Sequence, residues 1–228
     1  MEGSSQLSVN MAMTLDGRVM RPDGRWHGLT SREDRRRMDE HRSHARALLL
    51  GKASLIADDP IVRPVGKPSP RPIIISRGEP PPAQLRVFVG QPPALVLQSR
   101  AWIKTRREAQ DGGKSSEARL AELSERAEVL LVAPEELTPS RVLKRLSDAG
   151  MGQVLLEGGP TLNYAFFAAD LVDRFYLTLV PYVIGQAGLP GPVQGSAALS
   201  GFDRVGWELV RHEAIGSEVF LEYSRRRQ

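Results

Sequence analysis

The sequence contains no cysteine, which excludes disulfide bonds, thiolate nucleophiles and cysteine-ligated metal sites. This absence fits a cytoplasmic protein, which is the location that we expect. No run of about 18 apolar residues occurs, so no membrane-spanning helix is expected. Residues 1–6 also lack a basic region followed by an apolar one, and we therefore expect no secretory signal.

Several familiar motifs are missing as well. No G-x-G-x-x-G occurs, so the usual dinucleotide fingerprint is absent. Residues 113–115 (GKS) resemble the end of a P-loop, but Glu108 occupies the position of the first glycine of that motif. The four histidines do not form H-E-x-x-H, and His41 and His44 have no obvious third ligand. We therefore predict no metal site.

The length of the chain fits one α/β domain or two small ones. The chain has 228 residues, of which 41% are hydrophobic, and neither a fixed-period repeat nor a clear linker divides it. We expect a single domain over residues 1–228. The net charge of +4 suits phosphate ligands but is too small to indicate nucleic acid, and the aromatic–basic interleaving of single-strand binders is absent. No nucleic-acid partner is predicted.

Short apolar runs alternate with helical segments along the chain. Two alternating segments, 207–214 and 218–223, predict an antiparallel hairpin. The sequence therefore predicts an α/β fold with a mainly parallel sheet, helices on both faces and one antiparallel edge. The other expected strands are 7–13, 47–51, 73–75, 94–98, 129–132, 154–156 and 175–180, the expected helices are 31–44, 52–57, 117–126, 138–150 and 160–169, and residues 104–116 and 185–201 are expected to be loops. At the start of the first helix, Glu33 is available for a capping box.

Residues 153–163 (QVLLEGGPTLN) are the most informative stretch. They predict a buried strand, a two-glycine turn and a helix that begins at Pro160. A Gly-Gly turn before a helix lets the backbone approach a ligand and directs free N–H groups at an anion. The alternative is a tight strand–helix turn without a ligand. Glu157 would face the crevice in which open α/β sheets bind ligands.

Two further patterns point to the same edge of the sheet. Asp58, in the sequence Asp58-Asp59-Pro60, either marks the end of a helix or places a carboxylate over the crevice. The pairs Ser76-Arg77 and Ser99-Arg100 each close a strand. Arginine matches phosphate geometry, so these pairs could hold the 2′-phosphate of NADPH; otherwise they are solvated arginines at strand ends.

Taken together, five ordered segments resemble the reductase domain of riboflavin biosynthesis, a relative of dihydrofolate reductase. They are residues 10–18 (NMAMTLDGR), 51–60 (GKASLIADDP), 156–162 (LEGGPTL), 171–173 (LVD) and 181–185 (PYVIG). The resemblance implies an NADPH-dependent reduction of a phosphoribosylamino-pyrimidine to its ribitylamino form, with hydride transfer to C1′ of the opened ribose. It also implies a homodimer, for which the C-terminal hairpin is the natural edge to pair.

By motif position, the resemblance assigns residues to both ligands. Asp58 and Glu157 are the expected catalytic residues, with Glu157 facing the pyrimidine. The expected cofactor-binding residues are Ala12, Thr14, Ser54, Asp58, Gly158, Gly159, Pro160, Thr161, Leu162 and Asn163, to which the phosphate argument adds Ser76 and Arg77. The expected substrate-binding residues are Trp26, Arg42, Val62, Arg63 and Glu157, with Arg42 and Arg63 at the ribose phosphate.

The chain departs from the family pattern in several places. The basic residue after Asp-Asp-Pro is displaced, so that Arg63, Lys67 or neither serves the phosphate. Lys52 lies where the family often carries Gly-x-Gly-Thr, and the deaminase domain common in bacterial members is not found. Two alternatives remain: a paralogue that reduces a pterin, folate or other heterocycle, and a non-catalytic module that binds nucleotides or nucleic acid.

Overall fold

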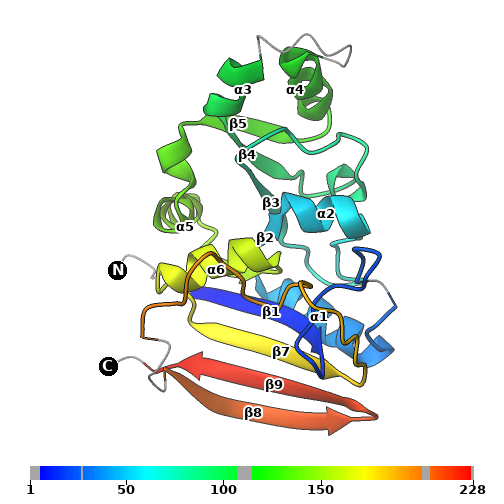
Figure 1. Ribbon diagram of the computed structural model, residues 1–228. Coiled ribbons are helices and arrows are strands. Elements are labelled where there is room, and N and C mark those ends of the chain that lie inside the picture. Colours follow the sequence, from blue (N-terminus) through cyan, green and yellow to red (C-terminus); the bar gives the residue numbers. More distant parts are fainter. Residues whose placement is uncertain (1–5, 27, 107–114, 202–205, 227–228) are drawn as a thin grey trace.

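The alternating apolar runs form one nine-stranded sheet in the order β5-β4-β3-β2-β6-β1-β7-β9-β8 (Figure 1). The computed structural model describes residues 6–26, 28–106, 115–201 and 206–226. The strands are β1 (Gln6–Thr14), β2 (Ala47–Gly51), β3 (Arg71–Ser76), β4 (Leu95–Ser99), β5 (Glu128–Val132), β6 (Gln153–Leu156), β7 (Arg174–Val180), β8 (Trp207–Ile215) and β9 (Glu218–Arg225). The helices are α1 (Arg32–His44), α2 (Lys52–Asp58), α3 (Arg100–Arg106), α4 (Ser116–Ser124), α5 (Pro139–Asp148) and α6 (Pro160–Ala168), with short 3-10 helices at Arg86–Phe88 and Pro134–Leu137.

All the strands are parallel except the C-terminal pair. β9 runs antiparallel to β7, and β8 runs antiparallel to β9. The sequence prediction of an α/β fold with a closing antiparallel hairpin is therefore confirmed. The loop expected at residues 185–201 contains no helix or strand, and it is also confirmed.

Two hydrophobic clusters hold the helices against opposite faces of the sheet. Leu49 and Leu156 face α5 and α6, whereas Leu48 and Leu155 face α2 and α4. Figure 1 shows these helices on the two sides of the sheet. Successive strand residues point to opposite faces, so a strand covered on both sides is apolar throughout. Each fully buried leucine stabilises the fold by about 1.5–3 kcal/mol.

Helix α1 packs differently, because both it and the strands beneath it are polar. Only Arg42 of α1 is fully buried, and the helix carries nine Arg, Asp or Glu residues in the sequence REDRRRMDEHRSH. In the sheet register Asn10 pairs with Tyr176, and Ala12 pairs with Thr178. The His41 ring of α1 stacks on Tyr176 with ring centroids 3.9 Å apart, so α1 covers this polar part of the sheet.

The structure corrects two sequence predictions. Ser31 caps α1, and its hydroxyl accepts the N–H groups of Glu33 and Asp34. The expected capping box with Glu33 does not form, because the Ser31 N–H donates to Glu218 Oε1 instead, at 2.8 Å. The expected loop at 104–116 is also wrong in part, since α3 extends to residue 106 and α4 begins at residue 116. Residues 107–114, including most of the P-loop-like segment, lie outside the described residues.

None of the helices in the described ranges combines the length and the apolar character that a membrane crossing requires.

Candidate functional site

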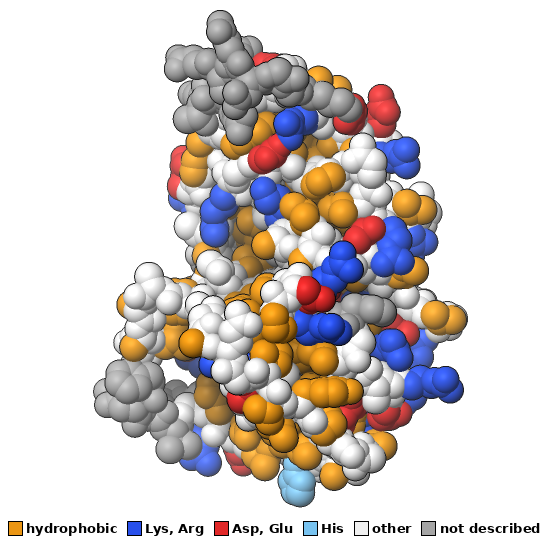
Figure 2. Space-filling model, turned by 45° about the vertical axis from the view of Figure 1, so that its right-hand side comes forward, with side chains coloured by type: hydrophobic (Ala, Val, Ile, Leu, Met, Phe, Trp, Pro, Cys, Tyr) orange, Lys and Arg blue, Asp and Glu red, His pale blue; other side chains and the backbone are white. Residues whose placement is uncertain are grey.

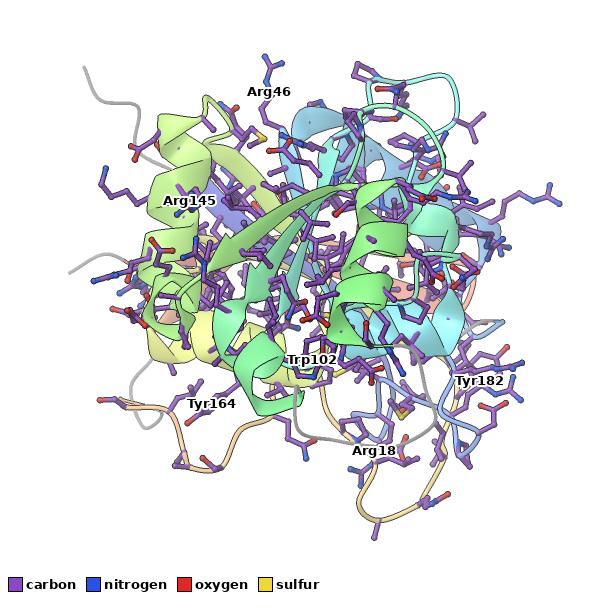
Figure 3. All side chains as sticks on the ribbon, turned by 90° about the horizontal axis from the view of Figure 1, so that it is seen from above. Arg18, Arg46, Trp102, Arg145, Tyr164 and Tyr182 are labelled. Atoms are coloured by element: carbon purple, nitrogen blue, oxygen red, sulfur yellow. The ribbon has the colours of Figure 1, made fainter. Side chains whose placement is uncertain are left out.

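The parallel strands bring polar and glycine residues to one edge of the sheet. The residues at or just before this edge are Thr14, Gly51, Ser76, Ser99, Leu156 and Val180. Figure 3 shows Arg18 and Tyr182, which follow β1 and β7, on one side of the molecule, and Arg46, which precedes β2, on the other. The carboxyl edge is where open α/β sheets bind ligands, so the candidate site lies here.

The predicted glycine turn lies at the centre of this edge. Gly158 has a φ of +81°, which favours glycine, and the Gly158–Gly159 peptide is cis. The Gly51 N–H donates to the Gly158 oxygen at 2.6 Å. A Cβ on Gly51 would fall 2.8 Å from Gly159 N and 2.9 Å from Gly158 O. The two strand ends therefore approach so closely that only glycine fits at residue 51.

Helix α6 begins directly after this turn and has no side-chain cap. Its first internal hydrogen bond joins the Asn163 N–H to the Gly159 oxygen at 2.9 Å. The N–H groups of Thr161 and Leu162 therefore have no partner within the helix, and they lie at its positive end. This arrangement suits a phosphate group.

Asn163 supplies a second sign of a ligand beside the turn. Its side chain is fully buried, and its Nδ2 donates to the Pro192 oxygen at 2.7 Å. Its Oδ1 is buried without a hydrogen-bond partner in the structure. Buried polar atoms normally have partners, so this oxygen is available to a donor group of a ligand. The glycine cradle and the orphaned oxygen together fit a bound dinucleotide.

The loop of residues 185–201 forms one wall of the site. Leu189 accepts a hydrogen bond from Arg18 Nη1 at 2.8 Å, and Pro190 accepts the Val19 N–H at 3.0 Å. At the other end of the loop, the Gln194 N–H donates to the Pro160 oxygen at 3.2 Å. The loop thus connects the segment after β1 to the start of α6.

Thr14, a predicted cofactor residue, helps to hold this wall. Its hydroxyl donates to Asp16 Oδ1 at 2.6 Å, and Asp16 also accepts the N–H groups of Ile184 and Gly185. The hydrogen bond from Thr14, followed by that from Gly185, lowers the pKa of Asp16 to about 2. Asp16 is therefore a charged anchor between the ends of β1 and β7.

Glu157 is fixed by a buried ion pair with Arg42. Arg42 Nε lies 2.8 Å from Glu157 Oε1, and Nη2 lies 2.6 Å from Oε2. The two side chains are only 3% and 9% exposed. Arg42 Nη1 also donates to the Ile61 oxygen at 3.3 Å. The structure therefore joins two predicted substrate residues to each other, and it locks the Glu157 carboxylate in one orientation.

Asp58 and its neighbours form the opposite side of the edge. Asp58 ends α2, and its Oδ1 accepts the Trp26 N–H at 3.0 Å, which holds the segment before α1. Val62 is 3% exposed and lies in the core cluster beneath α2. The Arg63 guanidinium lies against Gly90, where a Cβ would fall 2.0 Å from Nη1. The substrate roles of Trp26, Val62 and Arg63 stay predictions.

The remaining predicted cofactor residues occupy the same edge on both sides of the glycine turn. Ser54 lies against the turn, since a Cβ on Gly159 would be 2.9 Å from its Oγ. The buried Ser76 hydroxyl donates to the Glu79 oxygen at 3.0 Å, and Arg77 donates to the Leu137 oxygen at 2.8 Å. Arg77 is thus positioned by a main-chain oxygen, and its contact with a nucleotide phosphate stays a prediction.

A family comparison agrees with this geometry. Residues 5–221 match the model of the RibD C-terminal domain. The chain belongs to the RibD C-terminal domain family. The resemblance read from the sequence motifs is therefore confirmed.

Individual relatives fall into two groups by length. The 2,5-diamino-6-ribosylamino-4(3H)-pyrimidinone 5′-phosphate reductase of Methanothermobacter thermautotrophicus is 28% identical over 95% of this chain and 96% of its own. The riboflavin biosynthesis protein RibD of Actinobacillus pleuropneumoniae is 23% identical over 94% of this chain, which spans only 55% of that protein. The structure of a bifunctional deaminase/reductase from Thermotoga maritima has a TM-score of 0.75 at 20% identity, covering 98% of this chain and 57% of the other, and supports the fold.

Within this RibD-type domain, the structure reveals a buried carboxyl near Glu157 that the sequence did not single out. Asp34, in the first turn of α1, is largely buried, and this burial raises the pKa of its carboxyl. Hydrogen bonds with Thr178 and Thr30 act in the opposite direction, and the carboxylates of Glu218 and Glu157 add to the rise. No local signal in the sequence distinguishes Asp34 from the other charges of its helix. Its setting depends on the pairing of Ala12 with Thr178.

The described residues contain no cluster of metal ligands, and apolar side chains are exposed near the candidate site. Over residues 6–26, 28–106, 115–201 and 206–226, no three His, Asp or Glu side chains are grouped as metal ligands. Figure 2 shows acidic and basic side chains interspersed over one face, with hydrophobic side chains gathered in its lower half. Exposed apolar side chains near the candidate site are Leu15, Ile56, Ile61, Tyr182 and Val183. They offer an apolar rim beside the polar edge.

Proposed function

We propose that the protein uses NADPH to reduce the ribose of a 5-phosphoribosylamino-pyrimidine to the ribitylamino form in riboflavin biosynthesis. The observation that supports this most is the placement of the Gly158–Gly159 turn beside Glu157 at the carboxyl edge of β6. One side of this edge suits a dinucleotide phosphate, and the other presents an oriented carboxylate. Membership of the RibD C-terminal domain family agrees with both.

The glycine turn and the start of α6 would hold the dinucleotide. The unpaired N–H groups of Thr161 and Leu162 would meet a phosphate, and Asn163 Oδ1 would accept a hydrogen bond from the ligand. When bound, NADPH supplies the hydride. Ala12 and Thr14 end β1 beside this turn and would border the nicotinamide. Ser76 and Arg77, farther along the same edge, would meet the 2′-phosphate that distinguishes NADPH from NADH.

Glu157 would orient the pyrimidine through hydrogen bonds. Both of its oxygens already bind Arg42, and each carboxylate oxygen has a further lone pair for a ring N–H or amino group. Asp58 holds the Trp26 segment and would close the other side of the ring. Arg63, which lies beyond the end of α2, would meet the ribose phosphate.

Reduction before deamination is the order that we favour. The relative from M. thermautotrophicus, which this chain covers almost completely, is named for the 2,5-diamino compound. We therefore propose the diamino pyrimidine as the preferred substrate and the deaminated uracil as the weaker one.

Purified protein tests these proposals directly. It should oxidise NADPH only when a phosphoribosylamino-pyrimidine is present. The rate should be higher with the diamino form than with the deaminated form, and higher with NADPH than with NADH. The product should carry two hydrogens on C1′, as mass spectrometry of the ribitylamine would establish. A protein that turns over neither pyrimidine contradicts the proposed function, and equal rates with both pyrimidines contradict only the proposed order.

We also propose that two copies associate through the C-terminal hairpin. β8 is the outer strand of the sheet, and its side chains Leu209, Val210 and Ile215 are 45%, 53% and 37% exposed. An edge strand with exposed apolar groups is a ready surface for pairing. Light scattering should give about twice the chain mass of 25.1 kDa, and a mass equal to one chain would contradict the dimer.

A further inference from the structure

A small cavity lined by both polar and apolar side chains lies between α1 and the strands beneath it. Its volume is about 90 Å³, and its walls include Asn10 of β1, Asp34 of α1 and Thr178 of β7. A cavity needs about 10–15 Å³ of such space to hold one water molecule, so several water molecules fit here. The cavity gives buried Asp34 a route for proton exchange with water.

Burial raises the pKa of the Asp34 carboxyl, and the carboxylates of Glu218 and Glu157 that face it add to this rise. Hydrogen bonds with Thr178 and Thr30 act in the opposite direction. The arginines of the surrounding elements are paired with carboxylates other than Asp34. The pairs are Arg42–Glu157, Arg37–Glu33, Arg37–Glu213, Arg211–Glu213, Arg174–Glu222 and Arg36–Glu40. Glu218 accepts both the N–H and the hydroxyl of Ser31. His41, which also lines the cavity, has its pKa lowered to about 4 by burial and is neutral at pH 7.

The other two carboxyls at this edge already have structural partners. Glu157 accepts two hydrogen bonds from the Arg42 guanidinium, one on each oxygen. Asp58 accepts a main-chain N–H from Trp26. Burial and neighbouring carboxylates instead raise the pKa of Asp34, so its proton is retained to higher pH than an ordinary aspartate would allow.

Asp34 is also in the correct place to meet the substrate. Its partner Thr178 is the direct neighbour of Ala12 in the sheet register, and paired residues of adjacent strands point to the same face. Glu157 follows the end of β6, the strand on the other side of β1. A sugar held between Glu157 and the end of β1 therefore lies beside the first turn of α1.

We propose that Asp34 is the proton donor that opens the ribose ring, an inference that rests on the proposed function. The C1′–O4′ bond breaks, its electron pair goes to O4′, and O4′ takes the Asp34 proton. The lone pair of the exocyclic nitrogen forms the C1′=N bond of an iminium ion. C1′ then gains the hydride, which neutralises the iminium and gives the ribitylamine. Each turnover uses one hydride and one proton, and Asp34 regains its proton through the water-sized cavity.

The test compares the pH–rate profiles of wild type, Asp34→Asn, Asp34→Glu and the control Glu33→Gln with the diamino pyrimidine. Glu33 precedes Asp34 in the same helical turn, but its carboxylate binds Arg36 and Arg37 and is not among the groups that line the cavity. We expect Asp34→Asn to lower kcat by about 100-fold, within the range for general acid catalysis, with KM and NADPH affinity within about threefold of wild type. Asp34→Glu should recover part of the rate.

The pH profile separates a proton donor from a structural residue. In wild type, kcat should fall as the pH rises through the pKa of Asp34, whereas the slow Asp34→Asn enzyme should lack this alkaline limb. A solvent deuterium isotope effect on kcat should be present in wild type. Asp34→Asn with an unchanged rate and profile would overturn the inference, as would loss of NADPH affinity in parallel with rate. An inactive wild type would instead contradict the proposed function.

Discussion

The ion pair between Arg42 and Glu157 provides the sharpest test of how the substrate side is held together. Replacing Arg42 with Met leaves the Glu157 carboxylate buried beside the neutral thioether and without its guanidinium partner. Removing one partner of a buried pair costs about 3–5 kcal/mol, because the remaining charge has lost both water and its counterion. Domains of this size change in Tm by about 2–4 °C per kcal/mol, so the expected decrease is about 6–20 °C.

A double-mutant cycle would measure the coupling directly. Arg42→Met, Glu157→Leu and the double variant are compared with wild type by urea unfolding, with the slope of each transition checked for equality. The double variant should be markedly more stable than the sum of the two single losses predicts, because it contains no unpaired buried charge. Arg36→Met is the matched control, since the side chain of Arg36 is 57% exposed and its pairs are worth less than about 1 kcal/mol. A loss below about 1 kcal/mol for Arg42→Met would refute the reasoning.

Three further outcomes follow from the structure. Gly51→Ala should weaken NADPH binding and destabilise the protein by about 1–3 kcal/mol, whereas Gly78→Ala, where a Cβ meets nothing within 4 Å, should leave binding unchanged in a fluorescence titration. Burial lowers the pKa of His41 from 6.5 to about 4, so between these pH values the unfolded chain binds a proton at His41 that the folded chain does not bind. The free energy of unfolding of the wild type should therefore fall by up to about 3 kcal/mol as the pH falls from 6.5 to 4. In urea unfolding, His41→Phe, which keeps a ring against Tyr176, should remove this dependence. Because its folded pKa is lowered to about 2, Asp16 stabilises the fold above pH 4; this contribution should decline from pH 4 to 2 in acid unfolding and be absent from Asp16→Asn.

Local patterns in the sequence were enough to predict most elements. The apolar run at residues 47–51 predicts β2 with the bounds that the structure has, and Pro160 marks the first residue of α6. These elements could be predicted because residues adjacent in the sequence determine them. The capping box expected with Glu33 was wrong because the Ser31 N–H instead donates to Glu218, which lies 187 residues away in the chain.

In the candidate site as well, features set by adjacent residues could be predicted from the sequence, whereas contacts between distant residues could not. The glycine turn was predictable, since a two-glycine sequence between a strand and a helix has a direct steric meaning. The pairing of Arg42 with Glu157 was not, because the sequence assigns each residue to the substrate and contains no information that they meet 115 positions apart. Asp34 was missed for the same reason: it interacts with Thr178 and Glu218, which come from β7 and β9.

The contact between Ser31 and Glu218 has a consequence for how the site assembles. Glu218 begins β9, and both of its oxygens bind Ser31 at the cap of α1. The half of the crevice that would receive the sugar is therefore completed only when the C-terminal hairpin docks. The residues proposed to hold the dinucleotide lie in or directly after β1, α2, β3 and β6 and at the start of α6, and none of them belongs to the hairpin. A chain truncated before β8 should therefore still recognise the nucleotide while failing to order the first turn of α1.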